Sequence, residues 1–70
     1  MENIEEFKKT VAENLIKYRK TANLTQLELA EKLNYSDKAV SKWERGESIP
    51  DIWVLKEIAD IYSISVDDLI

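Results

Sequence analysis

The chain contains no cysteine and no histidine. Their absence excludes disulfide bridges, thiol nucleophiles and the ligand sets of zinc fingers. The chain also contains only one glycine and one proline. An all-β domain needs many turn-forming residues, so this composition instead favours helices joined by short connections.

Long apolar segments are also missing. No run of apolar residues approaches the roughly 18 residues that a membrane-spanning helix requires. Residues 1–6 carry three glutamates and have no apolar core, so they do not have the form of a signal peptide. We therefore expect a cytoplasmic protein without a membrane partner.

Patterns for catalysis and metal binding are not recognisable. Carboxylates alone can hold Mg²⁺ or Ca²⁺, but the spacing of an EF-hand does not occur. No side chains form the set of nucleophile, base and orienting group that an enzyme needs. We therefore expect neither an enzyme nor a bound metal or cofactor, and no small-molecule ligand in so short a chain.

What is present is typical of one small globular domain spanning residues 1–70. Hydrophobic residues make up 44% of the chain and charged residues 34%, which argues against disorder. The net charge of −4 is unevenly distributed. Residues 17–45 carry seven basic and four acidic side chains, whereas residues 46–70 carry one basic and six acidic ones. Because polyanion binding follows the local field, the middle segment is the part suited to nucleic acid.

Hydrophobic spacing predicts a first helix over about residues 4–21. Apolar side chains three or four residues apart form its inner face: Phe7, Val11, Leu15 and Tyr18. Thr25 and Glu28 have the spacing of a capping box and predict the start of a second helix. This helix should end at Asn34, because asparagine tolerates the left-handed backbone conformation. Its expected inner residues are Leu29, Ala30 and Leu33.

Three further helices are expected after this turn. Ser36 is suited to cap a third helix that ends near Gly46, and its inner side consists of Ala39, Val40 and Trp43. A fourth helix follows Pro50 and Asp51, with an apolar stripe formed by Ile52, Leu55, Ile58, Ala59 and Tyr62. Residues 65–68 have a second capping-box pattern and predict a short fifth helix, after which Leu69 points inward.

The second and third helices are short and are separated by about three residues around Asn34. Such a pair, here within about residues 25–45, is typical of a helix-turn-helix unit, whose second helix enters the major groove of DNA. Ala30 is small enough for the two helices to cross closely. The residues expected on the outer face of the third helix are polar: Asp37, Lys38, Ser41 and Lys42.

This segment resembles the phage repressor-like helix-turn-helix regulators, also called the xenobiotic-response-element family. The matching stretches are Asn23–Gln26, Leu29–Leu33, Ser36–Gly46 and Pro50–Ile52, and the resemblance covers about residues 11–70. It implies an all-α fold, a compact five-helix bundle of the lambda-repressor type in which helices two and three form the helix-turn-helix. It also implies a sequence-specific regulator of transcription, a repressor that binds pseudo-palindromic duplex operators as a homodimer.

The resemblance also implies roles for single residues. Gln26 would contact a phosphate and brace the recognition helix, and Arg45 would lie near another phosphate. Arg19 and Glu44 match a pair that ties the first helix to the end of the third. Residues facing base edges, with the two serines at the margins, would be Ser36, Asp37, Lys38, Ser41 and Lys42.

The chemistry of these side chains leaves alternatives open. Lysine suits the acceptors of guanine, and aspartate can accept from cytosine. Without the motif, however, Lys38 and Lys42 would indicate only a solvated helix face. Asp37 could equally well stabilise the positive N-terminal end of its helix.

A second group of residues points to protein contacts. Trp53 and Ile61 would face away from the stripe of the fourth helix, and Ile70 is an apolar chain end. These residues would form an interface between two copies, or alternatively a minor contact within the monomer or with a C-terminal segment beyond Ile70. The acidic total, Asp37 and Trp53 leave open a different function, a protein-interaction module such as an antitoxin-type or scaffold domain with weak or no DNA binding.

Overall fold

The structure is a computed structural model that describes residues 3–70. The sequence predictions that concern Met1 and Glu2 therefore lie outside the described residues. Within that range the elements are α1 (Ile4–Thr21), α2 (Gln26–Leu33), α3 (Asp37–Glu44), α4 (Ile52–Tyr62) and a 3₁₀ turn, η1 (Val66–Asp68). The predicted all-α class is confirmed. None of the helices in this range has the length and apolar character needed to cross a membrane.

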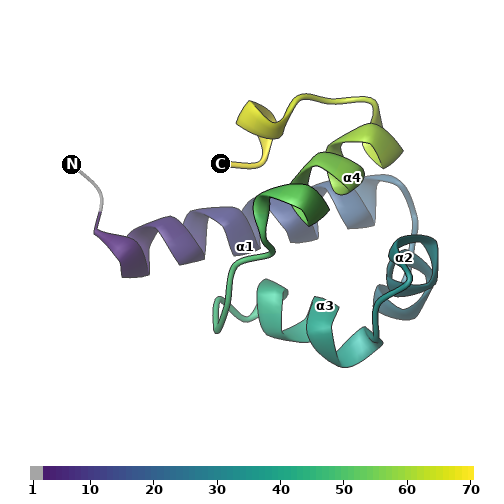
Figure 1. Ribbon diagram of the computed structural model, residues 1–70, viewed down its shortest axis with the longest axis horizontal. Coiled ribbons are helices and arrows are strands. Elements are labelled where there is room, and N and C mark those ends of the chain that lie inside the picture. The colour runs from purple at the N-terminus through teal and green to yellow at the C-terminus, as the bar shows by residue number, and fades with distance from the viewer. Residues whose placement is uncertain (1–2) are drawn as a thin grey trace.

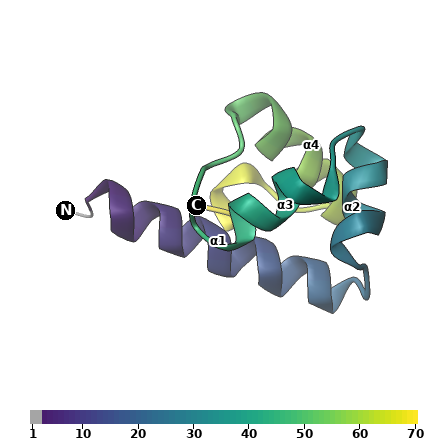
Figure 2. The same cartoon turned by 90° about the horizontal axis from the view of Figure 1, so that it is seen from below.

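The helices assemble around α1, which runs along the longest of the molecular dimensions, 33 × 24 × 21 Å. Figure 1 shows α3 below α1, with α4 and η1 above it and α2 at one end. In the perpendicular view of Figure 2, α3 lies in front of the rest of the bundle. One face of α3 is therefore left open to the surroundings.

Side chains that follow the expected capping rules define the helix ends. Thr25 and Glu28 form the complete capping box, in which each residue's backbone N–H donates to the other's side chain, at 2.8 and 3.0 Å. Ser36 accepts from the Ala39 N–H at 3.2 Å and so caps α3. Asn34 ends α2 in the left-handed conformation, with a φ of 59°. The sequence prediction of this turn is confirmed.

The core lies where α1, α2, α3 and α4 meet. Its largest fully buried side chains come from the four helices and from the residue after η1: Val11, Leu15, Leu29, Val40, Val54, Ile58 and Leu69. Trp43 is also buried, and Tyr35 packs on its ring with a centroid distance of 5.5 Å. The predicted inner faces of the first three helices are confirmed, with Phe7, Tyr18 and Ala39 partly buried at the edge of this core.

The predicted stripe of the fourth helix was wrong at its first member. Ile52 is 70% exposed, whereas Val54, which the prediction omitted, is 1% exposed. Asp51 caps the helix by accepting from the Val54 N–H at 3.0 Å, so Ile52 is the first helical residue. It lies about a quarter of a turn from the centre of the buried stripe, at an end where no neighbouring element covers it.

The predicted short fifth helix is present only as the 3₁₀ turn of residues 66–68, so the predicted five-helix bundle is not matched exactly. The Ser65 N–H and hydroxyl both donate to the Asp68 carboxylate, at 3.0 and 3.2 Å, which closes this turn. A single turn is enough to bury Leu69 completely. The side-chain amide of Asn14 then donates to the Leu69 carbonyl at 3.0 Å and ties the turn to α1.

Candidate nucleic-acid interface

The pair α2 and α3 has the geometry of a helix-turn-helix unit. The left-handed Asn34 reverses the chain, and the Tyr35 N–H donates to the Ala30 carbonyl at 2.9 Å. Ala30 is completely buried, which is consistent with the close crossing expected for so small a side chain. The turn therefore sets the angle at which α3 presents its outer face.

A buried network fixes the end of α3 from behind. The Glu44 carboxylate accepts from Arg19 Nε at 2.7 Å, from Arg19 Nη2 at 3.0 Å and from Gln26 Nε2 at 2.9 Å. The exposed fraction of the side chain is 12% for Arg19 and 4% for Glu44. The hydrogen bond to Glu44 raises the pKa of Arg19, although burial opposes this shift. The expected Arg19–Glu44 pair is thus present, and it joins α1, α2 and α3.

The outer face of α3 and the start of α2 enclose an open groove of about 280 Å³. Its lining consists of six of the seven residues expected at the DNA: Gln26, Asp37, Lys38, Ser41, Lys42 and Arg45. The seventh, Ser36, is exposed next to the groove, where its hydroxyl caps α3. The structure therefore brings the expected residues together on one surface.

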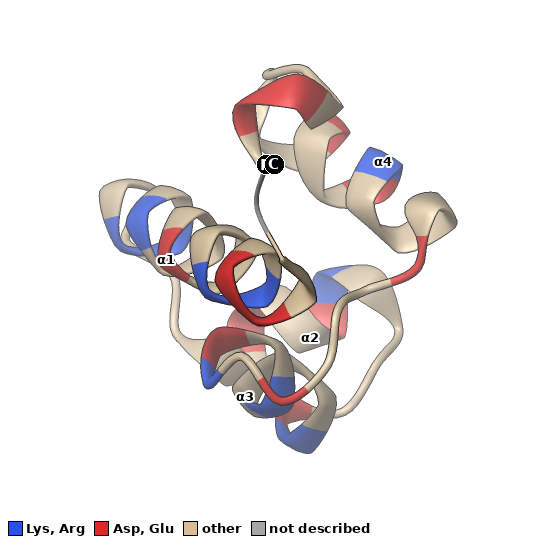
Figure 3. Cartoon of the chain, turned by 90° about the vertical axis from the view of Figure 1, so that its left-hand side faces the viewer, with Lys and Arg blue, Asp and Glu red and all other residues tan. Residues whose placement is uncertain are grey.

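Charge is unevenly distributed over the molecule. Figure 3 shows basic and acidic residues interleaved along α1 and around α3, whereas the upper part, with η1, is mainly acidic. Lys38, Lys42 and Arg45 give the groove three cations against the single acid Asp37 in its lining. The local charge at α3 thus opposes the net charge of −4, as a polyanion-binding face requires.

Sequence reasoning missed one charged residue beside the groove, Glu47. Its carboxylate lies 2.5 Å from Arg45 Nε, and Arg45 Nη1 also donates to the Ser41 hydroxyl. The hydrogen bond from Arg45 lowers the pKa of Glu47, and Lys42 adds to this effect. The positive φ of Gly46, 73°, turns the chain back towards α3. The only available signal was an acid two residues after Arg45 with a glycine between them.

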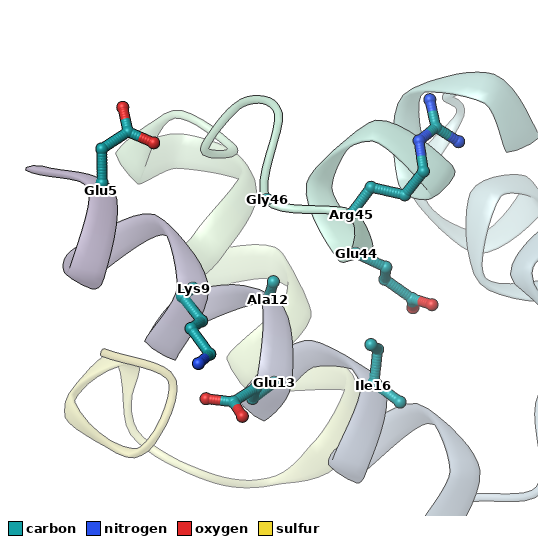
Figure 4. A pocket seen from close by; sticks show the side chains of 8 residues that line it. All are labelled: Glu5, Lys9, Ala12, Glu13, Ile16, Glu44, Arg45 and Gly46. Carbon is teal, nitrogen blue, oxygen red and sulfur yellow. The ribbon is translucent and has the colours of Figure 1, made fainter.

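A second hollow, also of about 280 Å³, lies between α1 and the end of α3. Figure 4 shows its lining, in which Lys9 and Glu13 project from α1 while the Arg45 guanidinium points elsewhere. Acidic and basic side chains are mixed here. No group of three or more potential metal ligands occurs among residues 3–70.

The three residues expected at an interface between copies do not behave alike. Trp53 is 73% exposed and Ile70 is 44% exposed. Ile61 is instead partly buried against the core, so the expectation that it points away from the molecule was wrong. It lies at the edge of the buried stripe, where packing from the core covers it. The apolar residue exposed next to Trp53 is Ile52.

A helix-turn-helix unit with a braced second helix and a cationic outer groove defines a class of DNA-binding protein. The helix-turn-helix family model matches residues 15–69 of this chain. The chain therefore belongs to the helix-turn-helix family of DNA-binding transcription regulators, in its phage repressor-like branch.

Several named regulators are similar to this chain. It is 43% identical over 58 residues to the transcriptional activator BcrR of Enterococcus faecalis, a match covering 83% of this chain and 28% of that protein. It is 37% identical over 59 residues to the cryptic phage CTXphi transcriptional repressor RstR of Vibrio cholerae, covering 84% and 53% respectively. The regulator ImmR of Bacillus subtilis is 34% identical over 61 residues, covering 87% and 48%. The chain thus spans about half the length of these relatives or less, and they include both an activator and a repressor.

Proposed function

We propose that this domain binds duplex DNA sequence-specifically, with α3 as the recognition helix in the major groove. The observation that carries the proposal is the single groove formed by six of the seven residues expected at DNA. We further propose that it acts as a repressor by occupying a pseudo-palindromic operator. The relatives include the repressor RstR and the activator BcrR, so this direction of regulation rests on steric occlusion of the operator and not on similarity.

The outer face of α3 supplies the base contacts in this proposal. Lys38 and Lys42 are exposed, and their ammonium groups suit the O6 and N7 acceptors of guanine. Asp37 lies in the first turn of α3 and can accept from a cytosine amine, with Ser36 and Ser41 contributing at the margins. These contacts carry the sequence information.

Phosphate contacts position the helix. The side-chain amide of Gln26 uses one hydrogen in its bond to Glu44, and we assign its second hydrogen to a phosphate oxygen. Arg45 directly follows Glu44 as the C-cap of α3, and its guanidinium can meet another phosphate. Lys17 and Lys20 are exposed in the last turns of α1 and extend the cationic surface.

We also propose that two copies bind one operator. The recognition helices of such a dimer reach successive major grooves about 34 Å apart. The interface would be centred on the exposed Trp53, with Ile52 beside it and Ile70 at its border. A large exposed aromatic side chain with an apolar neighbour is typical of such contacts.

Selection from a random duplex library tests the proposed function. The wild-type protein at low salt should enrich an inverted repeat, and the Lys38→Ala/Lys42→Ala variant should no longer select it. Lys9→Ala/Lys56→Ala removes the same charge outside the groove and should still enrich the repeat. If folded wild-type protein enriches nothing, α3 does not read bases.

Ile52 and Trp53 are exposed at the start of α4, which packs against the acidic η1, and they favour one other candidate function. This function is a protein-interaction module, such as an antitoxin-type or scaffold domain. DNA binding that falls steeply with salt would argue against it. A folded protein that binds no duplex but captures a partner through Trp53 would favour it.

A further inference from the structure

Glu47 lies just beyond α3, at the rim of the proposed DNA-binding groove. The Glu47 N–H donates to the Lys42 carbonyl at 3.0 Å, and the left-handed Gly46 precedes it. This turn directs the carboxylate back towards α3, where Glu47 Oε2 lies 2.5 Å from Arg45 Nε. Both side chains are about half exposed, at 53% for Arg45 and 52% for Glu47. The pair therefore belongs to the surface and not to the core.

The guanidinium of Arg45 is held from two sides. Its Nε donates to Glu47, and its Nη1 donates to the Ser41 hydroxyl on the preceding turn of α3. Ser41 and Arg45 both line the groove. The Glu47 carboxylate thus aligns this cation along α3 and at the same time neutralises its charge.

A phosphate approaching Arg45 must therefore compete with a carboxylate already bound there. A glutamate carboxyl is ionised at neutral pH, and Arg45 and then Lys42 lower the pKa of Glu47 further. Non-specific affinity for duplex DNA comes almost entirely from the phosphates that lysine and arginine neutralise. An ion-paired arginine contributes less to this phosphate-dependent affinity than an unpaired arginine does.

We propose that Glu47 is a positioning residue that limits the affinity of the groove for phosphate through Arg45. This inference rests on the proposed DNA-binding function. The effect concerns the DNA backbone, so it should be nearly the same for every duplex sequence. Base reading by Lys38 and Lys42 is left to decide between sequences. A domain with this built-in restraint binds unrelated DNA weakly and depends more strongly on its base contacts.

Titration of a short mixed-sequence duplex at several salt concentrations tests the proposal. We expect Glu47→Gln to raise the affinity about five-fold near 0.1 M salt and to steepen the slope of log K against log salt by about one. In an Arg45→Gln background the same substitution should have little effect, because no guanidinium is then released. Asp60→Asn is the matched control: it removes the carboxylate of another exposed ion pair, with Lys56 at 3.5 Å on α4, and should leave both quantities unchanged.

The possible outcomes distinguish the role of Glu47 from the proposed DNA-binding function. Glu47→Gln protein that binds no more tightly than wild type, or a gain that persists in the Arg45→Gln background, overturns the role of Glu47 alone. Wild-type protein that is folded but binds no duplex at low salt overturns the proposed function, and this inference with it. A thermal melt of each variant establishes that it is folded.

Discussion

Among residues 3–70, Glu44 is the only charged residue buried in the core. A carboxylate in such a place is unfavourable unless donors surround it. Arg19 and Gln26 supply three hydrogen bonds from two different helices. The buried charge thus fixes where the last turn of α3 lies relative to α1 and α2, which matters because bases are read over distances of a few ångströms.

Removal of Arg19 should be costly for this reason. Arg19→Met leaves the Glu44 carboxylate buried with Gln26 as its remaining side-chain donor, and we expect a loss of about 3 kcal/mol in the free energy of unfolding. The double variant Arg19→Met/Glu44→Leu should recover most of this loss, since no unpaired charge remains. Urea denaturation of both variants measures the difference. A single variant as stable as wild type would show that the pair contributes nothing.

The ion pair between Arg45 and Glu47 differs from the buried Arg19–Glu44 pair in what it affects. The Arg45–Glu47 pair is half exposed, so water screens it and its contribution to folding is small. Its consequence lies in DNA affinity instead. Two ion pairs at neighbouring positions of α3 thus serve different purposes because their burial differs.

At the scale of elements, the turn between α2 and α3 depends on the backbone conformation of a single residue. Asn34 has a φ of 59°, a region that asparagine enters more readily than most residues and glycine enters freely. This residue therefore contributes to the angle between the two helices of the DNA-binding unit.

Substitutions at Asn34 should follow this preference. Asn34→Gly should leave the free energy of unfolding unchanged or raise it slightly, whereas Asn34→Ala should lower it by about 1 kcal/mol. Asn23, with a φ of 62°, offers a matched position outside the turn and should respond in the same order. Thermal unfolding of the four variants measures the effect. Equal stability of Asn34→Ala and wild type would contradict the prediction.

The capping box of α2 should make stability depend on pH. Hydrogen bonds from the Thr25 backbone and side chain lower the pKa of Glu28 below its ordinary value of 4.5. Its contribution to stability is therefore complete above pH 4.5 and is lost as the pH falls through the lowered pKa of the folded state. Glu28→Gln keeps a hydrogen-bond acceptor but does not titrate. Melting temperatures should fall more for wild type than for this variant between about pH 5 and pH 3; parallel curves would contradict the assignment.

On the scale of the whole molecule, the basic and apolar surfaces are separate. The cationic groove lies on α2 and α3, whereas the exposed pair Ile52 and Trp53 lies at the start of α4. A partner copy on α4 would leave the outer face of α3 accessible. This arrangement is compatible with one dimer that binds two half-sites.

Trp53 should be the main contributor to self-association. Trp53→Ser should raise the dissociation constant of the dimer about ten-fold or more, because large aromatic side chains dominate interfaces of this kind. Ile4→Ser serves as the control, since Ile4 is 59% exposed at the far end of α1. Sedimentation over a range of concentrations measures both. Unchanged association of Trp53→Ser would remove this residue from the interface.

The sequence alone was sufficient for features that depend on neighbouring residues. The bounds of the first helix, the capping box at Thr25 and the left-handed Asn34 were all predicted, because hydrogen bonds and helical periodicity within a few residues determine them. The groove residues on α3 were also predicted, since a short helix capped at Ser36 has only one polar side, whereas Gln26 and Arg45 came from the resemblance to the family. The pairing of Arg19 with Glu44 came from the resemblance to the family.

Only the tertiary structure decided which residues at the margins are covered. Ile52 and Ile61 lie on opposite edges of one helical stripe, yet one is exposed and the other is partly buried. The difference depends on which distant elements pack beside each residue, and periodicity along the chain carries no such information. For the same reason the sequence did not show that a single 3₁₀ turn, η1, is enough to bury Leu69. It also did not show that Glu47 contacts Arg45, because this contact depends on how Gly46 turns the chain.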